Sequence, residues 1–204
     1  MKMNTIGFIG LGLIGGSIAK AIRAYHPDVR MIAYMRSQDT LQKAIDEGVI
    51  NEACSEVGEQ FAACDLLFLC APVETNARYL EQLKPMLPKT CLLTDVGSTK
   101  TDIHEKVDTL GLTGQFIGGH PMAGSEKTGY ENAKTHLIEN AYSVNTQGLK
   151  AKLSIFFRSC IPLPFLLSSR LYCRYRNLTD SAISLRIQLA DFTAGRELHP
   201  ALKN

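Results

Sequence analysis

Nearly continuous apolar runs alternate with helix-like stretches over the first part of the chain. The runs fall at residues 5–9, 29–34, 65–71, 91–96 and 116–118. Such runs are typical of strands that are buried on both faces of a parallel sheet. Between them, apolar residues recur at helical spacing over residues 14–25, 40–47 and 75–83. The pattern therefore predicts an α/β fold built on a doubly wound, mainly parallel sheet.

This pattern ends near residue 144, and the charge changes sign there. Residues 1–144 carry 13 Lys and Arg against 17 Asp and Glu, whereas residues 145–204 carry 9 against 3, so the net charge moves from −4 to +6. The apolar residues of the second part cluster without a sustained strand-like or helix-like period. We predict a domain over residues 1–143, followed by an atypical basic tail of unassigned structure over residues 144–204.

A glycine-rich loop stands between the first predicted strand and the first predicted helix. Its pattern is Gly10-x-Gly12-x-x-Gly15, and Leu13 and Ile14 open the helix. In this context Gly10 makes the turn, Gly12 lets a pyrophosphate approach the backbone, and Gly15 lets helix and strand pack closely. Free N–H groups at the helix start favour the phosphates. The loop therefore predicts a dinucleotide site at these five residues, in a sheet of the Rossmann type.

The residues after the second predicted strand bear on the choice of dinucleotide. An NAD site usually has Asp or Glu about 20 residues after the third glycine, where it bonds the ribose 2′-hydroxyl. This chain has Met35 there, followed by Arg36 and Ser37. Methionine accepts no such bond, whereas Arg36 and Ser37 suit a 2′-phosphate. We expect NAD or NADP as the cofactor, with a lean toward NADP; the alternative is that Arg36 is simply a solvated residue after a strand.

Polar residues also follow the later predicted strands, at the edge where ligands bind. His120 comes after the run at 116–118, among glycines and a proline that serve backbone shape. We interpret it as a proton acceptor near neutral pH, and the alternative is a structural histidine. Ser98 and Thr99 follow the preceding strand, and they either cap the next helix or hold a substrate carboxylate, to which Lys100 adds charge. Glu126 is either an exposed acid without function or part of the pocket mouth.

Bulk composition excludes several classes of partner. The formal charge is +2, and no basic run with interleaved aromatic residues occurs, so we expect no nucleic-acid partner. The longest apolar stretch, residues 153–167, contains Arg158, Pro162 and Pro164, so we expect no membrane span. The six cysteines show no Cys-x-x-Cys spacing, and several fall within apolar runs. These features favour a cytoplasmic protein with a small-molecule substrate.

Together these motifs resemble the prephenate/arogenate dehydrogenase family. The resemblance covers residues 4–143 and rests on segments 10–17, 71–73, 95–100 and 119–129, which appear in family order. Residues 139–142 are similar to the motif that closes the family's nucleotide domain. Residues 119–127 read Gly-His-Pro-Met-Ala-Gly-Ser-Glu-Lys, a run that excludes most other Rossmann dehydrogenases.

The resemblance implies a reaction and a set of site residues. The reaction is oxidative decarboxylation of prephenate to 4-hydroxyphenylpyruvate in tyrosine biosynthesis, with hydride passing to NAD(P) and no metal required. His120 takes the proton of the substrate hydroxyl, and Ser98 holds the same hydroxyl. Further residues that the resemblance brings to the dinucleotide are Ala71 and Pro72, and those that it brings to the substrate are Thr99, Ser125 and Glu126. Prephenate and arogenate both stay open as the substrate.

The second part of the chain departs from the family. Family members continue into a helical domain that forms the dimer and supplies a Ser-His-x-x-His segment and a carboxylate-binding arginine. No Ser-His-x-x-His occurs in residues 144–204. We hypothesise that the reading changes near residues 142–145, as a frameshift in the gene or its sequence would produce, leaving the family domain truncated. On this hypothesis the dimer interface is absent, and we expect weak cofactor binding with little or no turnover.

Overall fold

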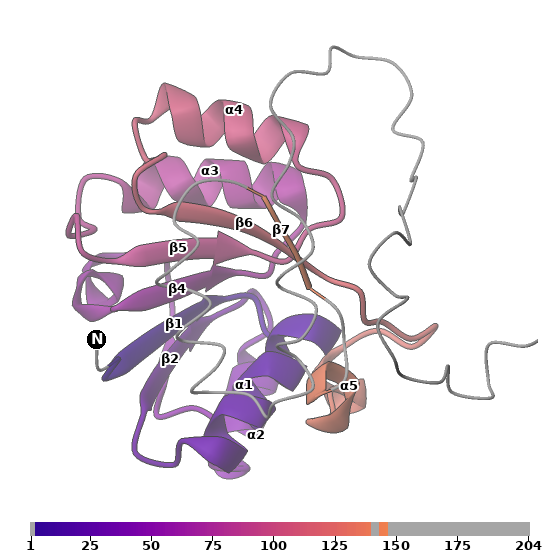
Figure 1. Cartoon of the computed structure of the whole chain (residues 1–204). Helices are drawn as coiled ribbons and strands as arrows, with labels where there is room; N and C mark the ends of the chain where they lie inside the picture. Colours follow the sequence, from indigo (N-terminus) through magenta and orange to yellow (C-terminus); the bar gives the residue numbers. More distant parts are fainter. Residues whose placement is uncertain (1–2, 140–142, 147–204) are drawn as a thin grey trace, which may run out of the picture. The chain divides into compact units, whose positions relative to one another are not determined.

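The computed structural model describes residues 3–139 and 143–146, which form a seven-stranded sheet with helices on both faces (Figure 1). The strand order is β3-β2-β1-β4-β5-β6-β7, in which β1 to β6 are parallel and β7 is antiparallel to β6. The order reverses beside β1, where doubly wound sheets bind ligands at the carboxyl ends of the strands. The strands are β1 (Thr5–Ile9), β2 (Arg30–Tyr34), β3 (Glu52–Cys54), β4 (Leu66–Leu69), β5 (Leu92–Asp95), β6 (Phe116–Pro121) and β7 (Ser143–Thr146).

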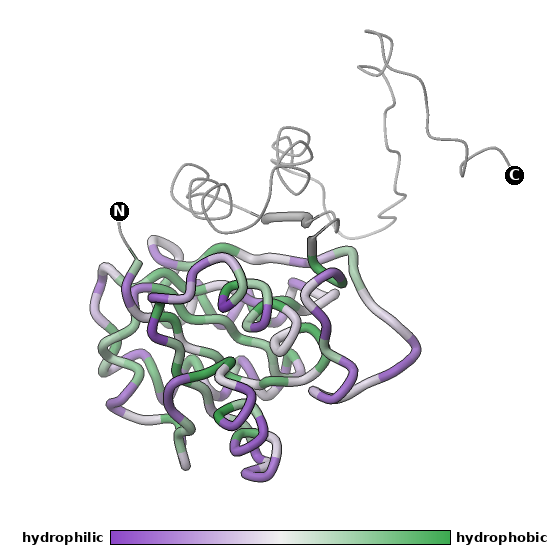
Figure 2. Tube along the Cα trace, turned by 90° about the horizontal axis from the view of Figure 1, so that it is seen from below, coloured by the Kyte–Doolittle hydropathy of each residue, from purple (hydrophilic) through white to green (hydrophobic). Residues whose placement is uncertain are grey.

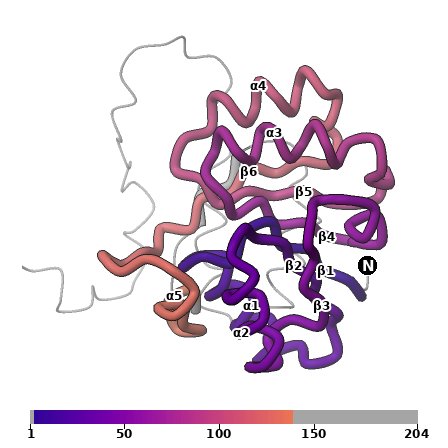
Figure 3. Tube along the Cα trace, turned by 180° about the vertical axis from the view of Figure 1, so that it is seen from behind, coloured from indigo at the N-terminus to yellow at the C-terminus, as the bar shows by residue number. Residues whose placement is uncertain are grey.

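Two hydrophobic cores lie between the sheet and its helices. Ile6 and Phe8 of β1 point into one core, where α1, α2 and α5 pack, and Phe8 stacks on Phe68 with ring centroids 5.1 Å apart. Ile9 points into the other core, which α3 and α4 cover (Figure 3). Each fully buried side chain of this size contributes about 1.5–3 kcal/mol relative to its exposed state. The helices are α1 (Leu13–Tyr25), α2 (Gln38–Asp46), α3 (Val73–Leu83), α4 (Thr101–Thr109) and α5 (His136–Glu139), with 3-10 turns η1 (Glu59–Ala63) and η2 (Tyr130–Asn132).

The observed elements follow the hydrophobic pattern of the sequence closely. Apolar residues run along the interior strands, and polar residues lie on the outer helices and loops (Figure 2). The predicted fold class is confirmed, because six parallel strands alternate with helices in the doubly wound order. The five predicted strands and three predicted helices are all present, with small shifts at their ends. The apolar-run pattern missed β3 and β7, which are short and partly polar.

One prediction about His120 was wrong. The histidine does not lie just past a strand, because β6 continues through Pro121. This extension exists because residues 118–121 pair with β7, and His120 faces Val144 in the antiparallel register. β6 therefore carries the imidazole, and the backbone at His120 is held in the sheet and not in a free loop.

Several expectations from the sequence concern residues outside this structure. Apart from β7, the basic tail and the hypothesised frameshift lie outside the described residues. Within residues 3–139 and 143–146, no helix is long and apolar enough to cross a membrane.

The described cysteines, Cys54, Cys64, Cys70 and Cys91, are free thiols, and burial raises the pKa of Cys54 to about 11. That thiol therefore stays protonated at neutral pH, and the cytoplasmic location stays a prediction.

Candidate functional site

The three glycines of the loop after β1 each meet a different physical requirement. Gly10 has a φ of +101°, a conformation that residues with a Cβ atom rarely adopt. A Cβ atom on Gly15 would lie 2.4 Å from the Gly10 carbonyl oxygen, so only glycine lets α1 pack against the turn. Gly12 has nothing within 4 Å of its Cβ position, which leaves that side of the backbone open. The loop backbone therefore packs tightly against the protein at Gly10 and Gly15 and leaves room for a ligand at Gly12.

The first turn of α1 presents polar backbone groups at this open side. Gly12 is the N-cap residue, no side chain caps the helix, and no acidic residue stands in its first turn. The first N–H groups of a helix have no partners within the helix, and the helix dipole adds positive charge there. Leu13 and Ile14, the partly buried first residues of α1, lie where these groups favour a phosphate.

A buried asparagine, which sequence reasoning did not single out, shapes the turn between β4 and α3. The Asn76 amide donates to the carbonyl oxygens of Leu69 and Ala71 at 3.2 and 2.8 Å, and its oxygen accepts from the Ala71 N–H at 3.2 Å. Pro72 then serves as the N-cap residue of α3. Asn76 therefore holds the predicted dinucleotide residues Ala71 and Pro72 in one backbone shape at the carboxyl end of β4.

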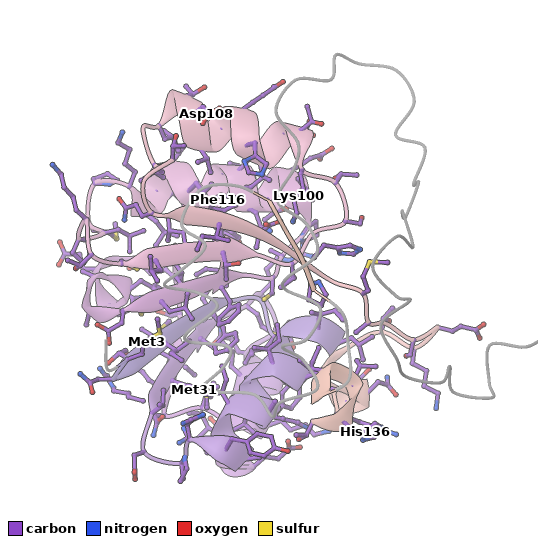
Figure 4. The ribbon with its side chains drawn as sticks, viewed as in Figure 1. Met3, Met31, Lys100, Asp108, Phe116 and His136 are labelled. Atoms are coloured by element: carbon purple, nitrogen blue, oxygen red, sulfur yellow. The ribbon has the colours of Figure 1, made fainter. Side chains whose placement is uncertain are left out.

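A buried ion pair joins the ends of β5 and β6. The Asp95 carboxylate, whose residue is 1% exposed, accepts from the N–H groups of Gly97 and Gly119 at 3.0 and 3.1 Å. The Lys100 ammonium lies 2.5 Å from the same carboxylate and donates to the carbonyl oxygens of Gly97 and Gly119 at 2.8 and 2.5 Å. Figure 4 labels Lys100 between α4 and the ends of these strands. The pair thus fixes the residue directly before His120.

Lys100 acts inside the protein and not on a ligand. An ammonium group has three protons, and Asp95, Gly97 and Gly119 accept all three. Burial lowers the pKa of Lys100 below its ordinary value, although the Asp95 carboxylate acts in the opposite direction. The expectation that Lys100 adds charge for a substrate carboxylate is therefore replaced by a structural role in positioning the two strand ends.

Ser98 and Thr99 lie exposed between β5 and α4. The helix-capping interpretation of these two residues was wrong, because Lys100 is the N-cap residue of α4 and no side chain caps that helix. In the described part of the chain, neither hydroxyl forms a hydrogen bond. Both groups are thus free to donate to or accept from a ligand at the carboxyl edge of the sheet.

His120 is half-buried at the same edge. Its Nδ1 atom is buried and has no hydrogen-bond partner among the residues that the structure describes. A buried polar atom without a partner is costly, so such atoms are retained mainly where a ligand or a function uses them. The Asp95–Lys100 pair fixes the backbone of Gly119, directly before His120, and His120 itself pairs with β7. The backbone that carries the imidazole is therefore held in place, and the buried Nδ1 atom is left without a partner in the described part of the chain.

The loop after β6 carries the remaining predicted substrate residues, and it is exposed. Ser125 and Glu126 both face solvent, and the Ser125 hydroxyl closes a local turn with Lys127. Met122, beside Pro121, is 56% exposed, which is unusual for a large apolar side chain. The structure thus places Ser98, Thr99 and His120 at one sheet edge, whereas Ser125 and Glu126 extend away on their own loop.

A cluster around Tyr130, also missed by sequence reasoning, anchors the end of this loop. The Tyr130 ring packs on Gly16 of α1, where a Cβ atom would come within 2.8 Å of the ring. The Tyr130 hydroxyl donates to the Glu47 carboxylate at 2.9 Å, and Lys20 pairs with the same carboxylate at 3.1 Å. The Lys20 ammonium also lies 4.5 Å from the centre of the ring. The cluster therefore ties the segment after His120 to α1 and to the end of α2.

We expect Tyr130→Phe to change how stability depends on pH. Burial alone would raise the pKa of Glu47, but hydrogen bonds from Tyr130 and Lys20 outweigh it and lower that pKa below 4.5. Because the folded-state pKa is lowered, this stabilisation is present above the ordinary value and is lost as the pH falls through the lowered one. Thermal unfolding followed by circular dichroism should give a lower midpoint for the variant at neutral pH and a shallower decline on acidification. A decline as steep as that of the unchanged protein would contradict the prediction.

Arg36 and Ser37 stand between β2 and α2, and both are exposed. Ser37 is the N-cap residue of α2, and its hydroxyl oxygen accepts from the N–H and the hydroxyl of Thr40 at 3.3 and 2.9 Å. Its remaining capacity toward a ligand is the hydroxyl proton. In the described part of the chain, Arg36 forms no ion pair.

Comparison with known families decides what this arrangement is. Residues 18–153 match the family model of the prephenate dehydrogenase nucleotide-binding domain. The chain belongs to the prephenate dehydrogenase family. The resemblance inferred from the sequence motifs is thereby confirmed, and the matched region includes β7.

Individual prephenate dehydrogenases and related enzymes share this domain. The chain is 40% identical over 149 residues to the prephenate dehydrogenase of Bacillus subtilis (strain 168), which covers 72% of this chain and 40% of that protein. The arogenate dehydrogenase of Synechocystis superposes with a TM-score of 0.68 at 34% identity, covering 76% of this chain and 55% of that one. The prephenate dehydrogenase of A. aeolicus, solved in complex with hydroxyphenyl propionate and NAD+, superposes with a TM-score of 0.70 at 30% identity. This match covers 78% of this chain and 57% of that one. The chain thus spans well under two thirds of the length of these relatives.

Proposed function

We propose that this chain carries the dinucleotide site and the proton acceptor of an enzyme that converts prephenate to 4-hydroxyphenylpyruvate by oxidative decarboxylation. The observation that carries the proposal is His120, whose buried Nδ1 atom has no partner in the described part of the chain. It stands at the carboxyl edge of the sheet, as do the exposed hydroxyls of Ser98 and Thr99. The 40% identity to the B. subtilis prephenate dehydrogenase supports the same reaction.

Each residue has a distinct part in the proposed reaction. The bound dinucleotide supplies the hydride acceptor for the ring carbon that bears the substrate hydroxyl. The N–H groups at the start of α1 hold the pyrophosphate, and the open face of Gly12 lets it approach. Ser98 donates to the substrate hydroxyl, and His120 accepts the proton that this hydroxyl releases. Loss of carbon dioxide then makes the ring aromatic and leaves the electron pair of the broken C–C bond on the former hydroxyl oxygen, which takes the proton back from His120 to give the phenol.

We also propose that the chain prefers NADP to NAD. Met35 accepts no hydrogen bond from a ribose hydroxyl, whereas the exposed Arg36 guanidinium and the Ser37 hydroxyl proton suit a 2′-phosphate. The A. aeolicus relative was solved in complex with NAD+, which supports a nicotinamide dinucleotide as the cofactor. The loop between β2 and α2 is where the two cofactors are distinguished.

Two other activities are supported by specific observations. The 34% identity to the Synechocystis arogenate dehydrogenase favours arogenate as the substrate. The second alternative is dinucleotide binding without turnover. The observation that favours it is that the matching family model describes a nucleotide-binding domain.

Steady-state turnover of the full chain tests these proposals together. Reduced nicotinamide is followed by absorbance with prephenate and with arogenate, each in the presence of NAD+ or NADP+. Turnover with prephenate and a higher kcat/KM for NADP+ than for NAD+ would support both proposals. Turnover with arogenate and not with prephenate would mean that arogenate is the substrate. A preference for NAD+ would overturn the cofactor proposal. Cofactor binding without turnover on either substrate would support the non-catalytic alternative.

A further inference from the structure

Two tyrosines join β2 to α3 near the point where β2 ends. Tyr34 is the last residue of β2, and Tyr79 lies in the middle of α3. Their rings meet edge to face, with centroids 5.6 Å apart. Since β2 and β4 both flank β1, this contact brings α3 toward the loop that carries Arg36. The Gly10 N–H donates to the Tyr34 carbonyl oxygen at 2.7 Å, so the tyrosine that contacts α3 also adjoins the glycine loop.

The surroundings of this tyrosine pair are cationic. Arg78 directly precedes Tyr79, and Arg36 follows Tyr34 by two residues, so the ring contact brings together the two segments that carry these arginines. Both guanidinium groups act to lower the pKa of Tyr79. Burial and Tyr34 outweigh them and raise the pKa of Tyr79, so the ring stays neutral at physiological pH. Arg36 and Arg78 are exposed, and neither forms an ion pair with another residue that the structure describes. Two arginines without an ion-pair partner among the described residues therefore stand beside the Tyr34–Tyr79 contact, one after β2 and one on α3.

The loop between β2 and α2 has too few donors of its own for a doubly charged phosphate. The Ser37 oxygen already accepts two hydrogen bonds from Thr40, and Asp39 places a negative charge in the first turn of α2. That carboxylate opposes the helix dipole, which would otherwise favour an anion there. Arg36 would be left as the main donor, and phosphate groups are usually bound by more than one charged donor. A second cation from α3 would meet this need.

We infer that Arg78 binds the 2′-phosphate of NADP together with Arg36, and that the Tyr34–Tyr79 contact holds α3 where Arg78 reaches it. Arg78 is then a specificity-determining residue on an element that the glycine pattern does not include. This inference rests on the proposed function, because it concerns the cofactor of the same site. It differs from the proposal for Arg36, since it requires a contribution from α3.

Binding measurements on the full chain test the role of Arg78. Isothermal titration gives the Kd values of NADP+, NAD+, 2′,5′-ADP and AMP for the unchanged protein and for Arg78→Gln. We expect about tenfold weaker binding of NADP+ and 2′,5′-ADP, which corresponds to ~1.4 kcal/mol, and unchanged binding of NAD+ and AMP. Arg30→Gln is the matched control, because Arg30 is exposed at the opposite end of β2 and pairs there with Glu52. It should leave all four Kd values unchanged.

The outcomes separate this inference from the proposal on which it rests. No change in the Kd of either dinucleotide would overturn the inference alone. Equal weakening of NADP+ and NAD+ would do the same, provided that the circular dichroism spectrum of Arg78→Gln matches that of the unchanged protein. Arg78→Lys keeps the charge but not the planar fork, so it should retain part of the selectivity for NADP+. Unchanged protein that binds neither dinucleotide would overturn the proposed function, and the inference with it.

Discussion

His120→Asn is expected to lower kcat with prephenate by about 10²- to 10⁴-fold, the usual contribution of a positioned acid–base group. Asparagine fills a similar volume and forms hydrogen bonds, but it does not accept a proton at neutral pH. Dinucleotide affinity should stay unchanged, because the glycine loop after β1 binds the pyrophosphate in the proposed site. Stopped-flow and steady-state absorbance of reduced nicotinamide, with binding measured separately, distinguish the two effects.

His136→Asn is the matched control for this experiment. His136 is exposed on α5, away from the ends of β5 and β6 (Figure 4), and the same substitution there should leave kcat unchanged. Equal kcat values for His120→Asn and the unchanged protein would remove the histidine from the mechanism. A loss of dinucleotide binding in His120→Asn would instead indicate that the ring supports the cofactor.

Lys100→Gln is expected to destabilise the protein by about 3–5 kcal/mol, the usual cost of removing one partner of a buried ion pair. The substitution leaves the Asp95 carboxylate, whose side chain is 1% exposed, without its cation. The carbonyl oxygens of Gly97 and Gly119 also lose their donor. The midpoint and slope of urea unfolding measure the change, and turnover should fall as well, because Gly119 directly precedes His120.

Lys106→Gln provides the comparison, because the chemical change is the same at an exposed pair. Lys106 pairs with Glu81, and these side chains are 30% and 51% exposed. Exposed pairs contribute about 0–1 kcal/mol, so this variant should unfold near the midpoint of the unchanged protein. Similar losses in the two variants would mean that the Asp95–Lys100 pair has no special structural role.

Much of the fold was predictable from the sequence, because its buried parallel strands are nearly continuous apolar runs. The runs at β4 and β5 could be located to within a few residues in this way. β7 could not, since a short, partly polar strand is defined by its hydrogen bonds to β6 and not by its own composition. The extension of β6 through His120 depends on that pairing, so it was missed for the same reason.

The parts of the candidate site that are formed by residues close together in the sequence were predictable. The spacing of Gly10, Gly12 and Gly15 contains the turn, the open face and the close packing that the structure shows. The partners of Asp95 and Lys100 were not predictable, because Gly119 lies 24 residues beyond Asp95 and only the fold brings them together. Arg78 and Tyr79 were overlooked because a helical arginine in an exposed position resembles any solvated residue.

The pairing between β6 and β7 determines how short a working fragment of this protein can be. β5 and β6 pair only at Phe116 and Ile117, so beyond them the strand that carries His120 has β7 as its ladder partner. A fragment that ended at residue 142 would keep every glycine of the nucleotide loop and yet lose that partner. In such a fragment, backbone amide exchange should speed up at residues 118–121 while it stays slow in the paired strands β1 and β4.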